Sequence, residues 1–389
     1  MHAKILAYDL TKVFERYKPN VELRKGIPMR RFVVLGGVGT IGRIVVRDLF
    51  ESNGENHIVV ADYRESAAWK FAESFNSPRV TAAFIDAHEP EKLKHTLRGQ
   101  TVAINCLQHD FNLTVMQAAL SAKIHYLDMG GLFSWTRKQL RLNKKFKDAG
   151  LTAILGMGCS PGITNVLAAY AVGKLGKVRS IKIRVGTADL SGQSGKELIF
   201  SYSAQTIVEE LTLEPWIFSN GKFRKVAPRS GWELTEFPEP LGNIWTLWTR
   251  HSEIATLPLN FKKHGLRYCD FKVNFEPDFV KEVMRRLEAG WTITQFQGLV
   301  EAPAQPNDYE VAQVRADDFI VECHAVSKPE WRACAGDINT ASPPSIVAQM
   351  VADGTIKKRG VLPPEIAVPI QPFFIELRKR GMEIEEFEL

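Results

Sequence analysis

Short apolar runs alternate with amphipathic segments along the first part of the chain. The runs contain few polar positions, which is typical of strands buried on both faces of a parallel sheet. Strands are predicted at 31–35, 57–62, 80–85, 102–105, 124–128 and 151–155. Helices are predicted between them, at 41–53, 65–75, 90–97, 111–122 and 134–149. This order predicts an α/β fold with a Rossmann-type, doubly wound parallel sheet.

The pattern changes after Pro161. Polar and apolar positions alternate at 178–186 and 266–276, as expected for strands of an antiparallel sheet. A stretch rich in Pro, Gly and Trp separates them at 212–260, and a helix near 278–290 and a strand at 310–323 follow. These features predict a second domain of the α+β class.

The two ends of the chain differ from both domains. Pro343 and Pro344 are expected to open a helix near 345–353, followed by a turn at 357–365, a helix at 372–380 and a solvated glutamate-rich end. The predicted division is therefore an extension at 1–28, domains at 29–160 and 161–342, and a C-terminal segment at 343–389. The extension is either an appendage before Met29 or an integral helix that covers a sheet edge.

Composition excludes several classes of protein. The net charge is +6, but residues 1–31 hold eight Lys or Arg and three acids, a balance of +5. The nearly neutral remainder argues against nucleic-acid binding. No apolar run reaches the length of a membrane span, so no membrane partner is expected. Five cysteines without a CxxC pair predict reduced thiols, no metal site and a cytoplasmic location.

A glycine-rich motif lies between the first predicted strand and the first predicted helix. Its residues are Gly37, Val38, Gly39, Thr40, Ile41 and Gly42, which form a complete G-x-G-x-x-G. In this context the glycines permit a tight turn and a close approach of the backbone to a pyrophosphate. The helix amides then bind the phosphates. The motif predicts a dinucleotide site. FAD is not favoured, because no second flavin signature follows later in the chain.

Three charged residues follow the next strands at the same edge. Asp62 ends the second strand, where a carboxylate binds the ribose hydroxyls and favours NAD. Arg64 lies two residues further and is suited to bind a 2′-phosphate, so NADP stays an alternative. Asp86 ends the third strand and lies either beside the adenine or in a surface turn.

The remaining strand ends should face the nicotinamide, because ligands bind beyond the carboxyl ends of such strands. Cys106 and Leu107 follow the fourth strand, and we expect Cys106 to pack against the ring or its ribose. The loop at 156–162 leads into a helix whose first residues, Thr164 and Asn165, are expected to hold a substrate carboxylate.

Several motifs in the same order resemble the saccharopine dehydrogenase family, and most closely its lysine 6-dehydrogenase branch. They are VVLGGVGTIG, INCLQHDFNLTVMQAAL, KIHYLDMGG, GMGCSPGITNVLAAYAV, HSEIATLPLNF and IKKRGVLPPEIAVP, within about residues 30–389. The resemblance implies a Rossmann domain, a second domain that binds substrate and forms a homodimer, and a C-terminal segment that returns to the Rossmann domain. It also implies hydride transfer between NAD(P) and a carbon that bears an amine.

Such a reaction needs a group that takes the proton of the amine. Asp128 is the first candidate, because it ends a strand at the catalytic edge; a helix cap or ribose contact is the alternative. His251 and Glu253 are further candidates, either for catalysis or as a structural loop pair. His109 and His125 are weaker. Arg250 and Arg267 are candidates for the substrate carboxylate, although surface arginines are common.

The preferred hypothesis is an NAD(P)-dependent amino-acid dehydrogenase, and the resemblance favours oxidative deamination of L-lysine at its ε-carbon. Two alternatives stay open. One is a reductive condensation of the saccharopine or carboxy-polyamine type. The other is a dinucleotide-binding sensor without turnover.

Overall fold

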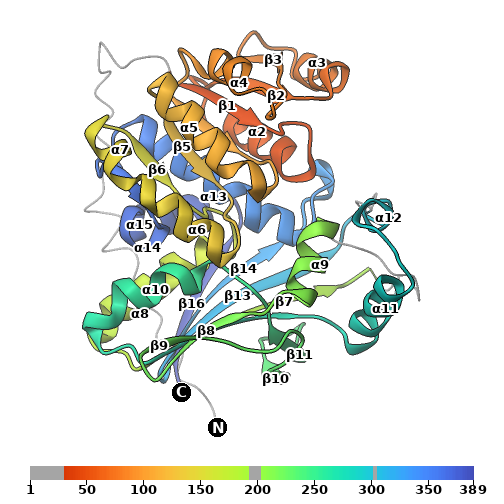
Figure 1. Cartoon of the computed structure of the whole chain (residues 1–389), viewed down its shortest axis with the longest axis vertical. Helices are drawn as coiled ribbons and strands as arrows, with labels where there is room; N and C mark the ends of the chain where they lie inside the picture. The colour runs from red at the N-terminus through yellow and green to blue at the C-terminus, as the bar shows by residue number, and fades with distance from the viewer. Residues whose placement is uncertain (1–29, 192–202, 301–304) are drawn as a thin grey trace.

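Two β-sheets with helices packed between them form the frame of the computed structural model, which describes residues 30–191, 203–300 and 305–389 (Figure 1). The predicted extension at 1–28 lies outside these residues. Among the described helices, none combines the length and apolar composition that a membrane span requires.

The first sheet is the predicted Rossmann sheet. All of its strand pairs are parallel, in the order β15-β6-β5-β4-β1-β2-β3. Its N-terminal elements are β1 (Arg31–Leu35), α2 (Thr40–Ser52), β2 (His57–Asp62), α3 (Glu65–Glu73), β3 (Val80–Phe84), α4 (Pro90–Leu97), β4 (Val102–Asn105), η1 (His109–Phe111), α5 (Asn112–Ala122), β5 (His125–Asp128), α6 (Phe133–Gln139), η2 (Leu140–Leu142), α7 (Asn143–Asp148) and β6 (Thr152–Ile154). The predicted α/β fold with a doubly wound parallel sheet is confirmed.

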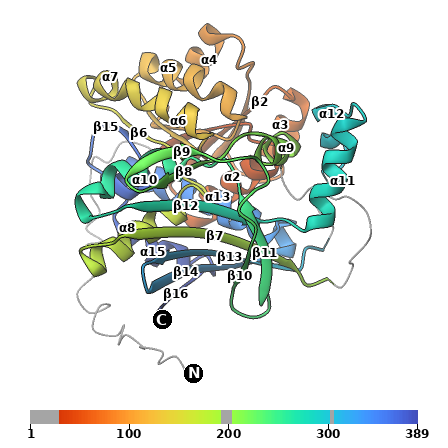
Figure 2. The ribbon, with the colours of Figure 1, turned by 60° about the horizontal axis from the view of Figure 1, so that its bottom comes forward.

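The second sheet is mixed and has the order β10-β11-β12-β7-β13-β14-β16, with β8 paired to β12 and β9 (Figure 2). The elements of this part are α8 (Ile163–Leu175), β7 (Ser180–Asp189), α9 (Ala204–Thr212), β8 (Trp216–Ser219), β9 (Lys222–Lys225), β10 (Glu233–Glu236), β11 (Asn243–Trp248), α10 (Glu253–Phe261), η3 (Lys262–His264), β12 (Tyr268–Asn274), α11 (Pro277–Glu288), α12 (Ile293–Gln297), β13 (Asp308–Ala316), β14 (Phe319–Val326) and η4 (Pro329–Trp331).

Two expectations for this sheet need correction. The strands predicted at 178–186 and 266–276 as antiparallel elements are β7 and β12, which pair in parallel with each other. Each is antiparallel to its other neighbours, β7 to β13 and β12 to β11 and β8. The single strand predicted at 310–323 is an antiparallel hairpin of β13 and β14, which turns at Asp317 with φ of 51°. A long apolar run that contains only a short turn is easily read as one strand.

The C-terminal segment also differs from its prediction. Its elements are α13 (Ala335–Ala352), β15 (Gly360–Leu362), α14 (Pro364–Ala367), α15 (Ile370–Arg378) and β16 (Glu383–Glu388). Pro343 and Pro344 lie inside α13 instead of opening a helix, so the boundary predicted after 342 falls within it. The predicted turn at 357–365 contains β15, and the glutamate-rich end is β16, which pairs with β14.

Helix α13 lies between the two sheets and packs against α2 and against β13 and β14. Most of its side chains are buried, and this tertiary packing stabilises a helix that two internal prolines weaken. On the Rossmann side, α2, α3 and α13 cover one face of the sheet, and α4, α5 and α7 cover the other.

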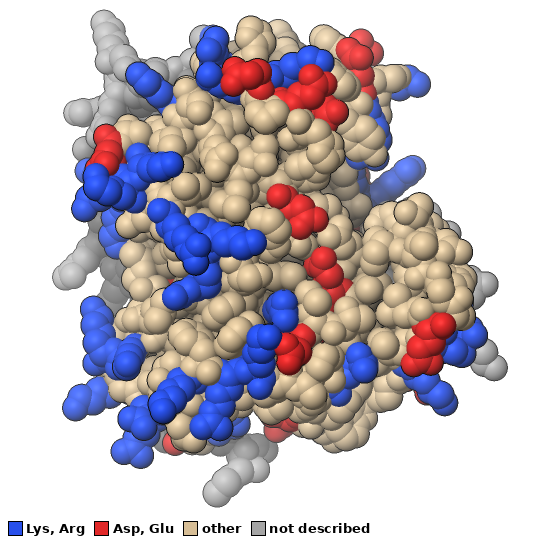
Figure 3. All heavy atoms as spheres, viewed as in Figure 1, with Lys and Arg blue, Asp and Glu red and all other residues tan. Residues whose placement is uncertain are grey.

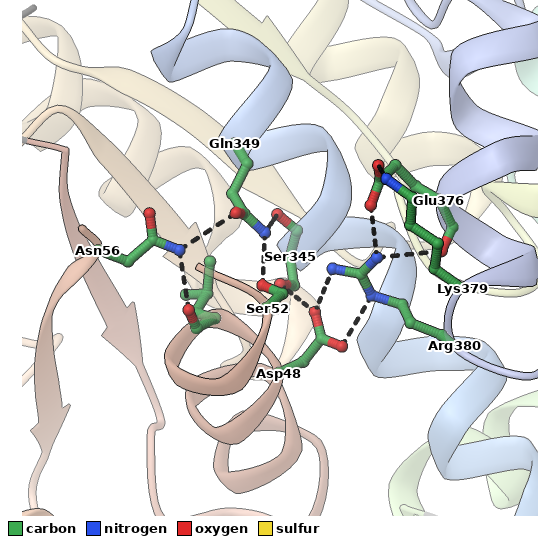
Figure 4. Close-up of polar contacts among 9 residues, drawn as sticks. Asp48, Ser52, Asn56, Ser345, Gln349, Glu376, Lys379 and Arg380 are labelled. Carbon is green, nitrogen blue, oxygen red and sulfur yellow. Dashed lines mark hydrogen bonds and ion pairs between the residues drawn. The ribbon is translucent and has the colours of Figure 1, made fainter. Parts of the chain in front are cut away.

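A buried polar network ties the C-terminal segment to α2 (Figure 4). Arg380 donates to Asp48 with Nε at 2.7 Å and Nη2 at 2.9 Å, and both side chains are almost inaccessible to solvent. Ser345 donates to the same carboxylate. Gln349 Nε2 donates to Ser52 Oγ at 3.0 Å, and Gln349 Oε1 accepts from Asn56 Nδ2 at 3.1 Å. The helix that begins at the glycine motif is therefore held by residues from the other end of the chain.

Candidate active site

The glycine motif forms a tight loop between β1 and α2. A Cβ atom at Gly42 would lie 2.1 Å from the carbonyl oxygen of Gly36, and one at Gly37 would lie 2.8 Å from Val60. Only glycine allows the loop to close against the start of α2, where Thr40 is exposed and Ile41 is half-buried. Helix amides at the end of a glycine cradle fit the pyrophosphate of a nicotinamide dinucleotide.

Asp62 joins the end of β2 to this loop. Its carboxylate is buried and accepts hydrogen bonds from the backbone of Val38 at 3.2 Å and of Arg64 at 3.0 Å. The Arg64 side chain also donates to it, with Nε at 3.2 Å. A hollow of about 450 Å³ lies beside them, lined by Arg64, Glu65, Ser66, Ala67 and Lys70. Asp62 suits the ribose hydroxyls, and Arg64 and Lys70 suit a 2′-phosphate.

The other predicted cofactor residues lie at two places. Cys106 and Leu107 are beside the glycine loop, because a Cβ atom at Gly36 would lie 3.2 Å from the Cys106 carbonyl oxygen and 3.1 Å from the Leu107 side chain. Asp86 lies in the turn after β3, where its carboxylate accepts from the backbone of His88 at 2.9 Å.

Asp128 is completely buried at the end of β5. Its carboxylate accepts four hydrogen bonds. The donors are Gly130 N at 2.8 Å, Gly156 N at 2.7 Å, Gln139 Nε2 at 2.6 Å and Tyr126 Oη at 2.9 Å. Burial raises the pKa of Asp128, and these four donors oppose that shift. The contacts hold together the loops that follow β5 and β6, and none of the carboxylate surface is left for a substrate.

His251 and Glu253 meet at the start of α10. His251 Nδ1 lies 3.0 Å from Glu253, and Nε2 lies 3.1 Å from Glu210 on α9. The imidazole also stacks on Phe271, with ring centroids 3.7 Å apart. Burial lowers the pKa of His251, but the two carboxylates outweigh it and raise the pKa to about 9. His251 is therefore an imidazolium at neutral pH, bracketed by two buried acids.

Thr164 extends this cluster to α8. Its hydroxyl donates to the second oxygen of Glu253 at 2.9 Å, and both residues are buried. Because α8 follows the loop after β6, the His251 cluster lies at the catalytic edge of the Rossmann sheet. Thr249 and Ser252 flank His251, and their buried hydroxyls have no hydrogen-bond partner among the described residues. Unsatisfied buried hydroxyls are uncommon outside functional sites.

Glu209, next to Glu210 on α9, reaches the Rossmann domain. Its carboxylate lies 3.6 Å from His109 Nε2. Gln205 on the same helix donates to Asp110 at 3.4 Å. In Figure 3 acidic groups occur along the boundary between the two domains, whereas lysines and arginines gather on the left, over α6, α7 and α10. Sequence reasoning missed Glu209 and Glu210, because nothing in VEELT distinguishes them from solvated helix residues.

Asn165 has a structural position. Its side-chain oxygen accepts from Gly162 N at 3.1 Å, and its amide nitrogen donates to Glu365 at 2.8 Å. Asn260 donates to the other oxygen of Glu365 at 2.7 Å. The His125 side chain also has a hydrogen-bond partner within the fold, because Nδ1 accepts from Thr152 N at 3.0 Å. Burial lowers the pKa of His125 to about 4. These contacts leave neither Asn165 nor His125 facing the His251 cluster.

The two candidate arginines differ in their positions. Arg250 precedes His251 and is half-buried; its Nε donates to the Glu214 carbonyl oxygen at 2.8 Å. Its terminal nitrogens have no hydrogen-bond partner among the described residues. Arg267 is exposed at the turn before β12, beside Gly221. Only Arg250 is placed next to the cluster.

Comparison with known proteins places both parts of the chain in one family. Residues 32–154 match the saccharopine dehydrogenase NADP binding domain, and residues 158–382 match the saccharopine dehydrogenase C-terminal domain. A carboxyaminopropylagmatine dehydrogenase from Synechocystis is 24% identical, covering 90% of this chain and 96% of that protein. A carboxynorspermidine synthase from Vibrio alginolyticus is 25% identical, covering 57% of this chain and 58% of that protein.

Solved structures share the fold over nearly the whole chain. The apo saccharopine dehydrogenase (L-Glu forming) of Saccharomyces cerevisiae has a TM-score of 0.70 at 16% identity. The match covers 92% of this chain and 100% of that one. The homospermidine synthase of Legionella pneumophila in complex with NAD has a TM-score of 0.68 at 14% identity, covering 94% of this chain and 92% of that one. With its nicotinamide-dinucleotide cradle and both family domains, the chain belongs to the saccharopine dehydrogenase family and is an NAD(P)-dependent oxidoreductase.

Proposed function

We propose that this enzyme transfers hydride at the secondary amine of a carboxy-polyamine, the carbon–nitrogen bond that joins an amino-acid fragment to a polyamine chain. In the oxidative direction the amine loses its proton, and the carbon next to it gives up a hydride. Water then cleaves the resulting imine to an amine and an aldehyde, and the reductive direction reverses these steps. The nicotinamide, when bound, accepts or supplies the hydride.

The observation that carries this proposal is the His251 imidazole between Glu210 and Glu253. A buried chain of carboxylate, imidazolium and carboxylate stores and passes protons. Both imidazole nitrogens face carboxylates at hydrogen-bond distance, so the proton from the amine enters at Glu210 and is shared through His251 with Glu253. Thr164 fixes Glu253 in this arrangement.

The charges of the site fit a cationic chain with one carboxylate. An imidazolium between two carboxylates has a formal charge of −1, and Glu209 and Asp110 lie along the same helix boundary. Coulombic attraction in a partly buried site favours ammonium or guanidinium groups. Arg250 supplies the complementary cation for the carboxylate.

The relatives support the carboxy-polyamine alternative over deamination of lysine, which the sequence resemblance favoured first. Two relatives are named for the substrates or products carboxyaminopropylagmatine and carboxynorspermidine. Lysine carries its second cation, the α-ammonium, on the same carbon as its carboxylate and has no cationic chain beyond the ε-amine. Lysine therefore offers the boundary acids fewer cationic groups than a carboxy-polyamine does.

Absorbance at 340 nm with NAD or NADP tests this proposal. Carboxyaminopropylagmatine and carboxynorspermidine are compared with lysine and saccharopine at equal concentrations. We expect kcat/KM for a carboxy-polyamine to exceed that for lysine by at least about a hundredfold, about 3 kcal/mol of discrimination. Faster turnover of lysine would overturn it, and cofactor binding without any turnover would favour a sensor.

We also propose that two copies of the chain form a homodimer, as the resemblance to the saccharopine dehydrogenase family implies. Light scattering should give twice the chain mass of 43.7 kDa; a mass of one chain would refute a homodimer.

A further inference from the structure

A small hollow lies outside the His251 site, where α2 and α3 meet the turn at 328–333. Its volume is about 180 Å³, and it is lined by Arg43, Ile44, Arg47, Phe71, Glu330, Trp331 and Arg332. The lining comes from both domains, because α2 and α3 belong to the Rossmann part and the turn precedes α13. Arg43 directly follows the last glycine of the motif.

The hollow has an excess of positive charge. Three guanidinium groups line it, and Glu330 is the one carboxylate among the lining residues. Arg47 has an ion pair with Glu51 at 3.9 Å. Neither Arg43 nor Arg332 has a carboxylate within ion-pair distance in the described ranges. Burial lowers the pKa of Arg43, and Asp337, which lies beyond ion-pair distance, opposes that shift only in part.

The turn is held rigidly against these cations by its own backbone. Arg43 donates to the carbonyl oxygens of Trp331 at 2.5 Å and Arg332 at 2.6 Å, and Arg47 donates to that of Glu330 at 3.3 Å. Lys328 and Ala333 close the turn with two backbone hydrogen bonds, at 2.8 and 3.1 Å. The hollow is therefore formed before any ligand arrives, which lowers the entropic cost of binding.

The remaining walls are aromatic. Trp331 is almost fully buried, and Phe71 faces the hollow from α3. Planar guanidinium groups bind a phosphate through paired hydrogen bonds. Apolar walls exclude water and strengthen that attraction.

We propose that this hollow binds a phosphate monoester at the junction of the two domains. Such a group carries up to two negative charges, which would balance Arg43 and Arg332, the two lining guanidinium groups without an ion-pair partner among the described residues. Two sources share this chemistry. One is the 2′-phosphate of NADP, which would then lie at Arg43 beside the glycine loop instead of at Arg64 and Lys70. The other is a separate phosphorylated metabolite that would act away from the His251 cluster.

The test measures the thermal midpoint of the enzyme saturated with NAD, so that the glycine loop is occupied. Inorganic phosphate is titrated against potassium acetate at matched ionic strength. We expect phosphate alone to raise Tm by about 2 °C or more at saturation. The Arg332→Gln variant should weaken the fitted phosphate Kd about tenfold. Arg141→Gln, an exposed arginine on η2, should leave it unchanged.

Saturation with NADP instead of NAD distinguishes the two sources. Loss of the phosphate effect with NADP assigns the hollow to the 2′-phosphate, and its persistence assigns it to a separate metabolite; both outcomes support the site. An equal rise of Tm in phosphate and acetate would overturn the proposal. So would an unchanged phosphate Kd in both Arg332→Gln and a second variant, Arg47→Gln.

Discussion

The carboxylate of Glu209 lies 3.6 Å from His109, across the boundary between the second domain and the Rossmann domain. The next residue, Glu210, lies 3.1 Å from His251 within the second domain. Two consecutive glutamates of α9 therefore contact histidines from different domains. Helix α9 therefore connects the His251 cluster to the Rossmann domain.

Replacement of His251 should separate catalysis from cofactor binding. His251→Asn removes the shared proton and leaves Glu210 and Glu253 facing each other, so we expect kcat to fall by about 10² to 10⁴. The Kd for NAD should stay within about twofold, because the glycine loop is untouched. His95→Asn on the surface of α4 is the control. Turnover at the wild-type rate would remove His251 from the mechanism.

The same histidine predicts how stability depends on pH. Its pKa is raised from 6.5 to about 9 in the folded protein, so the folded state binds the proton more tightly than the unfolded state. The resulting stabilisation is complete below pH 6.5 and is lost as the pH rises through about 9. We expect up to about 3 kcal/mol. Denaturant unfolding of wild type and His251→Asn between pH 6 and 9.5 measures it; parallel pH curves would contradict the shift.

Asp128→Asn should act mainly on stability. The amide replaces an acceptor with a donor, which then opposes Gln139 Nε2 and Tyr126 Oη in a fully buried position. We expect a loss of about 2–4 kcal/mol in the free energy of unfolding. Chemical denaturation measures it, with the exposed Asp148→Asn as the control. A variant that keeps wild-type stability but loses turnover would instead support Asp128 as the proton acceptor.

Gly42→Ala should abolish dinucleotide binding. Its Cβ would lie 2.1 Å from the Gly36 carbonyl oxygen, so the loop must open and the amides that face the pyrophosphate must move. We expect the Kd for NADH, measured by fluorescence titration, to rise by at least about a hundredfold. Gly54→Ala, where the added carbon meets no atom within 4 Å, should bind normally. Near-normal binding by Gly42→Ala would argue against the cradle.

Asp62→Ala tests the ribose end of the site. NAD loses the acceptor for its ribose hydroxyls, whereas Arg64, released from its ion pair with Asp62, and Lys70 stay available for a 2′-phosphate. We expect about tenfold weaker NAD binding and little loss for NADP, a difference of about 1.4 kcal/mol. Calorimetry with both cofactors measures it, and Glu73→Ala on α3 is the control. Equal losses for both would show that Asp62 acts only through the loop.

The Rossmann part could be predicted because its signals are local. Each strand is a short apolar run, each helix has its own period, and Asp62 and Asp128 end their strands where the pattern placed them. The His251–Glu253 pair was also visible, because the two residues are close in sequence. Their partner Glu210 was not, because only long-range folding brings α9 beside α10.

The second domain was harder to predict for a related reason. The stretch at 212–260 contains β8 to β11, whose short strands are stabilised by pairing rather than by their own sequence. Likewise, Pro343 and Pro344 are strong local signals against a helix interior, and only burial between two sheets overrides them.

The placement of β15 has a consequence for synthesis of the protein. This strand completes the Rossmann sheet beside β6, and Arg380 neutralises Asp48 behind the glycine loop. During synthesis, the first 150 residues therefore leave the ribosome well before β15 and Arg380, which complete the sheet and balance Asp48. Until then β6 presents an open edge to other chains. Until the last thirty residues have been synthesised, the incomplete domain can associate with other chains or bind chaperones.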